Sequence, residues 1–157
     1  MPTKLPKLTL VVAVSTIGIF AADNSLGTWT RDVAKTKVTP TPVSPVKSQT
    51  IVREAANGGV KHTSKTERMD GVVSESTFTA KYDGKAVPVT GSGSYDTISW
   101  KQVDANRFTM DTRKTDGKYQ TTGTVTVSKD GKTMTGTQKG TDADVKPTEF
   151  TVVLDKQ

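Results

Sequence analysis

The chain has 157 residues, a length that suits one domain, and a formal net charge of +6 at pH 7. It contains no cysteine, which excludes a disulfide framework, and its single histidine argues against the common zinc-ligand sets. Hydrophobic residues make up 32% of the chain, which is below the usual share, and Thr, Ser and Gly fill the deficit in place of long charged blocks.

Residues 1–22 have the pattern of a secretory signal peptide. Two lysines precede an apolar segment of 13 residues, Leu8–Phe20, and Ala21-Ala22 offers a small-residue cleavage site. The apolar segment is too short to span a bilayer, which needs about 20 residues. We therefore expect a secreted or periplasmic protein that does not insert into the membrane after signal removal; the alternative is an uncleaved amphipathic anchor.

The charge that remains after signal removal is small and dispersed. Loss of Lys4 and Lys7 leaves 20 basic and 16 acidic residues, a formal net charge of +4. Lysine and aspartate alternate through turns such as Lys81–Lys85 and Lys114–Lys118. A nucleic-acid binder concentrates its basic residues on one face, with aromatic residues among them. We expect no nucleic-acid partner.

The first part of the exported chain, residues 23–47, is predicted to form one strand and a strap. Gly27–Thr30 is predicted to be a short strand, followed by one helical turn over Asp32–Lys35 with Asp32 as its N-cap. Three prolines between Thr39 and Val46 favour an extended strap over one end of the domain. A flexible linker is the alternative interpretation of this segment.

The rest of the chain, residues 48–157, is predicted to be a β-meander. Asp130-Gly131, between two runs rich in Thr and Val, is a strong hairpin signal. Period-two alternation marks Glu75–Tyr82 as a half-buried strand. The predicted strands are Ser48–Ala55, Val60–Met69, Glu75–Tyr82, Ala86–Val89, Thr97–Val103, Arg107–Arg113, Tyr119–Val127, Thr133–Lys139 and Glu149–Asp155.

About eight to ten strands joined by short turns predict an all-β, up-and-down antiparallel meander. Closing the meander into a barrel removes the long edges that an open sheet of this size would expose. The spacing of roughly 10 residues per strand and turn also fits a β-sandwich. The barrel is our prediction because crossover connections are not evident, and the sandwich is the alternative.

The N-terminal residues carry a resemblance to known proteins. Gly27-Thr28-Trp29 is similar to the Gly-x-Trp of the lipocalin and fatty-acid-binding-protein superfamily. Gly27–Val38 more closely resembles the start of a group of small exported bacterial proteins that open with Gly-Thr-Trp, followed by Asn/Asp-Val-Ala-Lys-Ser-Lys-Phe. Further segments that fit this pattern are Ala80–Lys85, Pro88–Gly91, Asp96–Ile98 and Ser128–Thr135.

The resemblance implies a lipocalin-like barrel in which Trp29 plugs one end. Lipocalins place an arginine near the last strand against this tryptophan, whereas the final strand here offers only Lys156. Fatty-acid-binding proteins hold a carboxylate with an arginine and a tyrosine on late strands, and Thr151–Leu154 carries neither. A buried fatty-acid carboxylate is therefore not carried over from the resemblance.

The largest side chains on the predicted inner face are the candidate ligand-lining residues. Such residues either fill a small barrel as its core or border a cavity. Interior Thr, Ser and Gly leave room, and apolar walls with a few polar groups suit a small hydrophobic or amphipathic ligand. The candidates are Phe78, Tyr82, Trp100, Phe108, Met110 and Tyr119.

Catalytic and metal-binding groups are scarce in the sequence. His62 lies in a polar run and is predicted to be a surface strand residue, not a general base. Half of the acidic residues lie in or beside turns, where Asp accepts nearby backbone N–H groups. Asp142-x-Asp144 lacks the further oxygen ligands of a calcium loop. We expect no catalytic residue, no metal and no cofactor.

Three functions remain open from the sequence. The first is a non-enzymatic protein that binds a small apolar or amphipathic molecule inside the barrel, which would require an interior void. The second is a non-catalytic envelope structural or interaction protein with a filled barrel and an exposed apolar patch. The third is an enzyme on the same scaffold, marked by a buried acid with a strongly shifted pKa. The oligomeric state is left open.

Overall fold

The computed structural model describes residues 22–42 and 44–157, so all of the predicted signal peptide except Ala22 lies outside the described residues. The described chain consists of ten β-strands, and no helix occurs in it that could cross a membrane. The strands are β1 (Gly27–Thr39), β2 (Val46–Ala56), β3 (Gly59–Arg68), β4 (Val73–Lys81), β5 (Asp83–Pro88), β6 (Thr97–Gln102), β7 (Arg107–Arg113), β8 (Gln120–Val127), β9 (Thr133–Thr141) and β10 (Pro147–Lys156).

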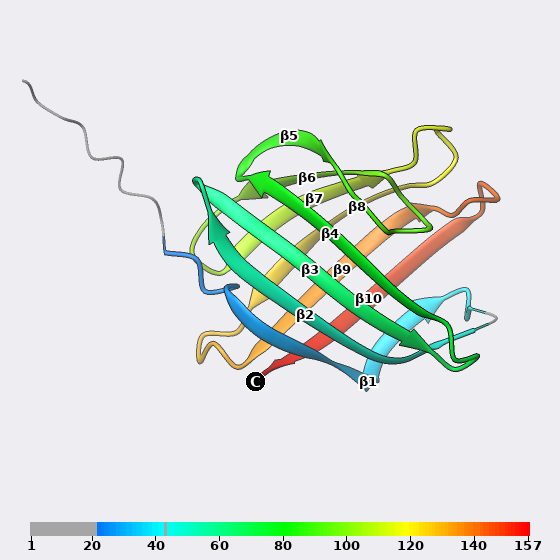
Figure 1. Ribbon diagram of the computed structural model, residues 1–157, viewed down its shortest axis with the longest axis horizontal. Helices are drawn as coiled ribbons and strands as arrows, with labels where there is room; N and C mark the ends of the chain where they lie inside the picture. The colour runs from blue at the N-terminus through cyan, green and yellow to red at the C-terminus, as the bar shows by residue number, and fades with distance from the viewer. Residues whose placement is uncertain (1–21, 43) are drawn as a thin grey trace, which may run out of the picture.

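All ten strands belong to one antiparallel sheet with the order β4-β3-β2-β1-β10-β9-β8-β7-β6-β5 (Figure 1). The first and last strands are neighbours, with Trp29 opposite Lys156 in the β1–β10 ladder. The sheet therefore consists of two meanders, β1–β4 and β5–β10, that the β1–β10 ladder joins. The all-β meander and its barrel shape are confirmed, and the two-sheet sandwich is wrong because one continuous sheet contains every strand.

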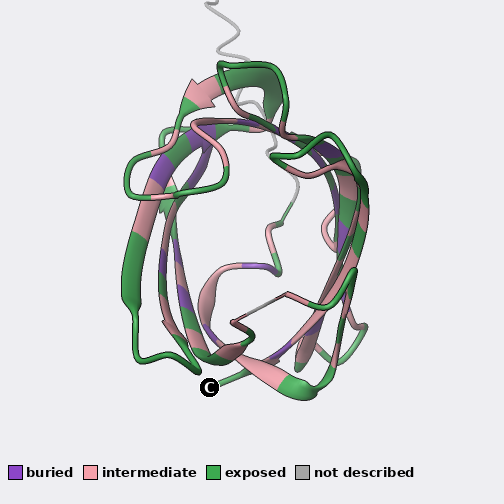
Figure 2. Cartoon of the chain, turned by 90° about the vertical axis from the view of Figure 1, so that its right-hand side faces the viewer, coloured by how far each residue is buried: buried purple, intermediate pink, exposed green. Residues whose placement is uncertain are grey.

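The sheet curls until its two edges nearly meet, as the view along the barrel shows (Figure 2). At this seam one antiparallel bridge joins Thr77 of β4 to Thr90, which follows β5. Its two N–H···O distances are 2.9 and 3.0 Å. Gly91 lies so close to β4 that an added Cβ would stand 1.9 Å from the carbonyl oxygen of Glu75, and its φ is +80°. Only glycine fits this position without displacing the backbone.

The predicted helical turn over Asp32–Lys35 is wrong, because β1 runs on to Thr39. The local bonds that suggested a helix start are present. Asp32 Oδ1 accepts the backbone N–H of Lys35 at 3.0 Å, and the Thr36 hydroxyl donates to the Asp32 carbonyl at 2.8 Å. They produce a register shift between Asp32 and Lys37 in the ladder with β10. The Asp32 side chain therefore stabilises a bulge in β1 and not the first turn of a helix. Pairing with β10 keeps this segment in the strand.

Residues with positive φ in the turns, and the alternation of buried and exposed residues along the strands, determine which side chains face the barrel interior. Asn57 and Gly58 have φ values of 43° and 78°, as a two-residue hairpin between β2 and β3 requires. Along β7, buried and exposed residues alternate strictly. Inward-facing side chains form one cluster: Trp29, Ile51, Val60, Phe78, Ala80, Ile98, Trp100, Phe108, Met110, Val125, Val127, Met134 and Leu154.

Candidate ligand-binding cavity

The barrel interior contains a cavity of about 840 Å³ that is partly open to solvent. Its apolar wall includes Ile98 and Met110 on one side of the barrel and Ile51 and Leu154 on the other. Towards one end it is bordered by the loops that follow β1 and β5, among them Thr41–Pro42 and Gly91–Tyr95. These loops surround the barrel end that faces the viewer in Figure 2.

The opposite end of the barrel is closed by Trp29 and the lead that precedes β1. The Trp29 side chain is fully buried, and its indole N–H donates to the Ser25 carbonyl at 2.9 Å. Lys156 Nζ lies 5.1 Å from the Trp29 ring centroid, so a lysine cation stands over the indole. Asn24 extends the closure, since its N–H donates to the Ala105 carbonyl at 3.1 Å in the β6–β7 turn.

The six candidate lining residues divide between these two regions. Phe78, Trp100, Met110 and Tyr119 line the cavity. Phe108 is instead fully buried beyond the cavity, towards the closed end, and Tyr82 packs against it with ring centroids 5.3 Å apart. Tyr82 donates a hydrogen bond to Asp23 of the N-terminal lead, so it belongs to the closure of the barrel.

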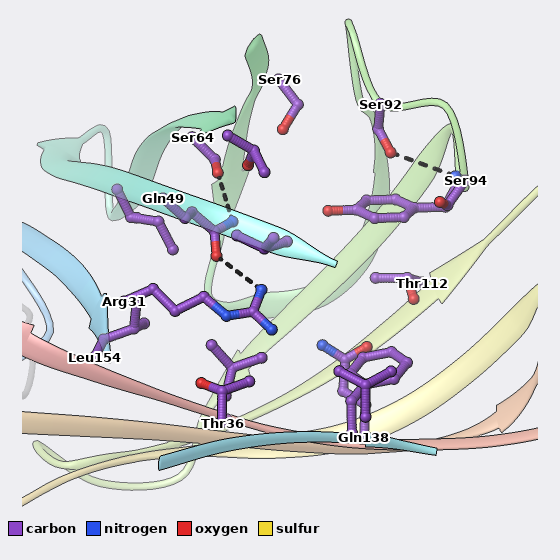
Figure 3. Close-up of a pocket in the computed structure, with 18 of the residues that line it drawn as sticks. Arg31, Thr36, Gln49, Ser64, Ser76, Ser92, Ser94, Thr112, Gln138 and Leu154 are labelled. Atoms are coloured by element: carbon purple, nitrogen blue, oxygen red, sulfur yellow. Dashed lines mark hydrogen bonds between the residues drawn. The ribbon is translucent and has the colours of Figure 1, made fainter. Parts of the chain in front are cut away.

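One polar relay crosses the cavity wall from β1 through β2 to β3 (Figure 3). Arg31 Nη1 donates to Gln49 Oε1 at 3.4 Å, and Gln49 Nε2 donates to Ser64 Oγ at 2.9 Å. Arg31 Nε is buried without a partner. Burial lowers the pKa of Arg31, but an arginine side chain stays protonated in proteins, so the relay keeps its positive charge.

A second polar group lies on the opposite wall, on β7, β8 and β9. The buried hydroxyls of Thr112 and Thr121 are 2.6 Å apart, and Thr121 donates to Gln138 Oε1 at 2.7 Å. Gln138 Nε2 lies 3.5 Å from Met110 Sδ, which is a weak acceptor. Thr112 and Gln138 face Arg31 across the cavity in Figure 3. Hydrogen-bonding groups therefore border the apolar part of the cavity on two sides.

Arg53 is the most deeply buried charged residue of the cavity lining, with 2% of its surface exposed. Its guanidinium carbon lies 4.5 Å from the Trp100 ring centroid and 5.6 Å from that of Phe108. Nη1 approaches Met134 Sδ at 3.7 Å, and Nε and Nη2 are buried without a partner. Burial is the main reason that the pKa of Arg53 is lowered.

His62 lines the cavity beside Arg53, and the prediction of a surface position is wrong. It lies opposite Arg53 in the β2–β3 ladder, and its ring stacks on Phe78 with centroids 4.7 Å apart. Burial, with a smaller contribution from the Arg53 charge, lowers its pKa to about 3. The imidazole is therefore neutral at pH 7, and its Nδ1 is buried without a partner.

Sequence reasoning missed Arg53, Arg31 and His62. Arg53 could have been found, because it stands two residues after Ile51 and so shares its face of the strand. Arg31 stands two residues after Trp29 in the same way. His62 stands two residues after Val60, but the rest of the run to Arg68 is polar on both faces, so this signal was weak.

The loop after β5 contributes a further polar side chain to the cavity. Tyr95 stacks on Tyr119 with ring centroids 6.0 Å apart, and the Tyr95 backbone N–H donates to Ser92 Oγ at 3.4 Å. Burial raises the pKa of Tyr95 to about 12, so its hydroxyl remains a donor at any physiological pH. Ser92 and Ser94 stand at this side of the cavity in Figure 3.

No family model matches the chain, and no curated protein matches it either. Within residues 22–42 and 44–157 there is no group of three or more His, Cys, Asp or Glu side chains that could hold a metal ion.

Proposed function

We propose that the protein is a non-enzymatic, lipocalin-like binding protein that holds a small apolar or amphipathic molecule inside its barrel. The observation that carries the proposal is the cavity of about 840 Å³, with apolar walls and a few hydrogen-bonding groups. Pockets that enclose a drug-sized ligand measure roughly 300–1,000 Å³. A filled barrel would leave no void beside Phe78, Trp100 and Met110, whereas all three border one here.

The proposed place of action is the periplasm or the extracellular space. Residues 1–22 support it through their lysines, apolar segment and small residues, although these residues lie outside those that the structure describes, apart from Ala22. The dispersed charge of the exported chain supports a small-molecule partner over nucleic acid.

Binding is favoured over catalysis by the state of the polar groups in the cavity. His62 is held neutral next to a permanent cation, with a pKa of about 3, far below the range in which a histidine base works near neutrality. No Asp or Glu occurs among the described residues that line the cavity. The hydroxyls of Thr112 and Thr121 bond to each other and to Gln138, not to a base.

A second candidate function is a non-catalytic envelope interaction protein. Its support is the β3–β4 turn, where Met69, Val72 and Val73 are 66%, 55% and 56% exposed. Three exposed apolar side chains on one hairpin form a plausible partner contact. The cavity makes this candidate the weaker one, since a protein that only docks partners needs no void in its barrel.

The proposal is tested by native mass spectrometry of the exported protein, together with binding of the neutral fluorescent probe N-phenyl-1-naphthylamine. Gly136 of β9 borders the cavity, and a Cβ there would meet only Val125 at 3.7 Å, an ordinary contact. Gly136→Leu should therefore fill part of the void without breaking the sheet. We expect the wild type to bind the probe, or to retain a co-purified small molecule, and Gly136→Leu to bind at least about tenfold more weakly.

The matched control is Thr137→Val, which changes an exposed residue on the outer face of the same strand. This variant should bind as the wild type does. Equal probe binding by Gly136→Leu and the wild type, with both variants folded, would place the probe outside the barrel and contradict the proposal.

A further inference from the structure

At the inner end of the cavity, several hydrogen-bond donors have no partner among the described residues. Arg53 Nε, Arg53 Nη2 and Trp100 Nε1 are buried without a partner, and so is His62 Nδ1. Buried polar atoms in folded proteins are almost always paired, because each unpaired one loses its hydration without compensation. Three definite donors within one stacked arginine–tryptophan pair form a gap that a ligand acceptor would fill.

The positive charge in this region has no carboxylate bonded to it. The described residues lining the cavity include Arg31, Lys37, Arg53 and Arg68 but neither Asp nor Glu. Tyr82 and Asp23 both favour the charged form of Arg53, Tyr82 also through a side-chain hydrogen bond, but the Asp23 oxygens themselves accept the Ser25 N–H at 2.8 Å and the Tyr82 hydroxyl. A buried cation is stabilised when an anion is paired with it directly.

One edge of the Arg53 guanidinium has no hydrogen-bond partner among the described residues, and neighbouring side chains enclose it. Trp100 covers one face of the guanidinium plane at 4.5 Å, and stacking of this kind leaves the in-plane N–H groups free. Nε and Nη2 are adjacent donors on one edge, which is the pair that a carboxylate accepts in bidentate fashion. With His62 neutral, the local charge to be balanced is one, which matches one carboxylate better than a doubly charged phosphate.

We propose that the ligand is an amphiphile with a single terminal carboxylate, bound head-first at the inner end of the cavity by the free edge of Arg53, with Trp100 and His62 beside it. This inference rests on the proposed binding function and specifies its ligand class. The arginine belongs to β2, so the site does not use the last strand, where fatty-acid-binding proteins place their arginine and tyrosine.

The tail of the ligand would run from Arg53 towards the loops at the open end. Ile51, Ile98 and Leu154 line this path with apolar surface. Arg53 Nη1 lies 3.7 Å from Met134 Sδ, and a shift of the unbranched Met134 side chain would give the guanidinium room to move towards the carboxylate. Arg31 lies further along the cavity wall, on β1, where it bonds Gln49 of the neighbouring strand β2. Gln49 and Arg53 are four residues apart, which is about 13 Å along β2.

The test compares decanoate with 1-decanol, which has the same chain and no charge, as displacers of N-phenyl-1-naphthylamine at pH 7. Wild type, Arg53→Met and Arg31→Met are measured, because both variants remove one cation from the same cavity. We expect the wild type to prefer decanoate by at least about tenfold. Arg53→Met should lose this preference while still binding the probe and 1-decanol, and Arg31→Met should retain it.

The orientation is tested with decanoate labelled with ¹³C at the carboxyl carbon, in the presence of a soluble gadolinium chelate. A head group at the inner end should be shielded, so its signal should stay narrow while that of free decanoate broadens. Equal binding of decanoate and 1-decanol, a preference lost in Arg31→Met alone, or a broadened bound signal would each overturn the inference and leave the binding function standing. Absence of all probe and ligand binding would overturn both.

Discussion

The guanidinium carbon of Arg53 lies 4.5 Å from the centroid of the Trp100 ring, inside the barrel. The two residues come from β2 and β6, which are separated in the sheet by five other strands on one path around the barrel and by β3, β4 and β5 on the other. The contact therefore crosses the interior. It also means that the partner of a buried cation is an aromatic face and not a carboxylate, which has consequences for stability.

Arg53→Met is expected to leave the free energy of unfolding unchanged or to raise it by up to about 2 kcal/mol. The desolvation cost of a buried ion is several kcal/mol, whereas a cation–π contact returns about 2 kcal/mol. Methionine has a similar length and no charge, so it removes the cost and keeps most of the packing. Urea unfolding of the ligand-free protein at pH 7 measures the difference.

Trp100→Ala is the informative comparison for that measurement. It removes a buried indole and should destabilise the protein by about 3–5 kcal/mol. If Arg53→Met lost as much stability as Trp100→Ala, Arg53 would be a residue that holds the fold together. Its proposed role as the ligand-binding residue would then lose its support.

His62 should make the protein less stable as the pH falls from about 6.5 towards 3. Its folded-state pKa of about 3 is below the value of 6.5 for an exposed histidine, so the unfolded chain binds the extra proton in this window. Stability is complete above the unfolded pKa and falls by up to about 1.4 kcal/mol per pH unit below it. Urea unfolding at pH 7, 6 and 5 would measure the slope.

Between pH 6.5 and 5, the pH dependence of stability should come from His62 and not from the acidic residues. The carboxyls of Asp32, Glu67, Asp96 and Asp104 have pKa values lowered mainly by hydrogen bonds, so they stay ionised in this interval. His62→Phe keeps a ring against Phe78 and removes the titration. The variant should be nearly insensitive to pH there; an unchanged slope would mean that another group is responsible.

The strand order was accessible from the sequence because turn residues and period-two alternation repeat through the chain. The Arg107–Arg113 strand matches the prediction at both ends, where large residues alternate with charged ones. The Asp32–Lys35 segment did not, because hydrogen bonds within four residues look the same in a helix start and in a bulge. The choice between them depends on β10, more than a hundred residues away.

Two glycines on neighbouring strands should respond oppositely to alanine. A Cβ on Gly123 of β8 would stand 2.0 Å from the Thr137 carbonyl oxygen, so the backbone of β8 or β9 must move. We expect Gly123→Ala to lower the thermal midpoint by about 7 °C or more, since a shift of this ladder should cost at least about 2 kcal/mol. Circular dichroism melting gives the value.

Gly136→Ala is the matched control, because its Cβ would only touch Val125 at 3.7 Å. Alanine loses less backbone entropy on folding than glycine, so this variant should be as stable as the wild type or slightly more stable. Similar losses in the two variants would show that the close approach of β8 and β9 at Gly123 is not what distinguishes the two positions.

Trp29 and Lys156 should contribute very unequally to the closed end of the barrel. Trp29→Ala removes a fully buried indole and its bond to Ser25, and should cost about 3–5 kcal/mol. Lys156→Met keeps the aliphatic stem over the ring and loses the cation, which should cost no more than about 1 kcal/mol. Urea unfolding of the two variants tests this; a larger effect of Lys156→Met would make the cation a main support of the closure.

The candidate site was only partly accessible from the sequence, for a physical reason. Large apolar residues such as Trp100 and Met110 indicate the inner face of a strand, and the sequence predicted that these two line the cavity. Arg53 and His62 belong to the same face, but charged residues are expected outside unless a partner for them is visible. Here the partners are aromatic rings on other strands, Trp100 for Arg53 and Phe78 for His62, so the residues next to Arg53 and His62 in the sequence do not reveal these partners.

The ladder between β1 and β10 joins the two ends of the described chain, while β4 and the segment that follows β5 share one bridge. Gln157 donates its backbone N–H to the Thr28 carbonyl at 3.0 Å. A chain whose residues 22 and 157 were joined by a flexible linker could be reopened at Asp83-Gly84. Such a rearranged protein would begin and end at the seam, so this barrel lends itself to circular permutation and to the insertion of a reporter domain between β4 and β5.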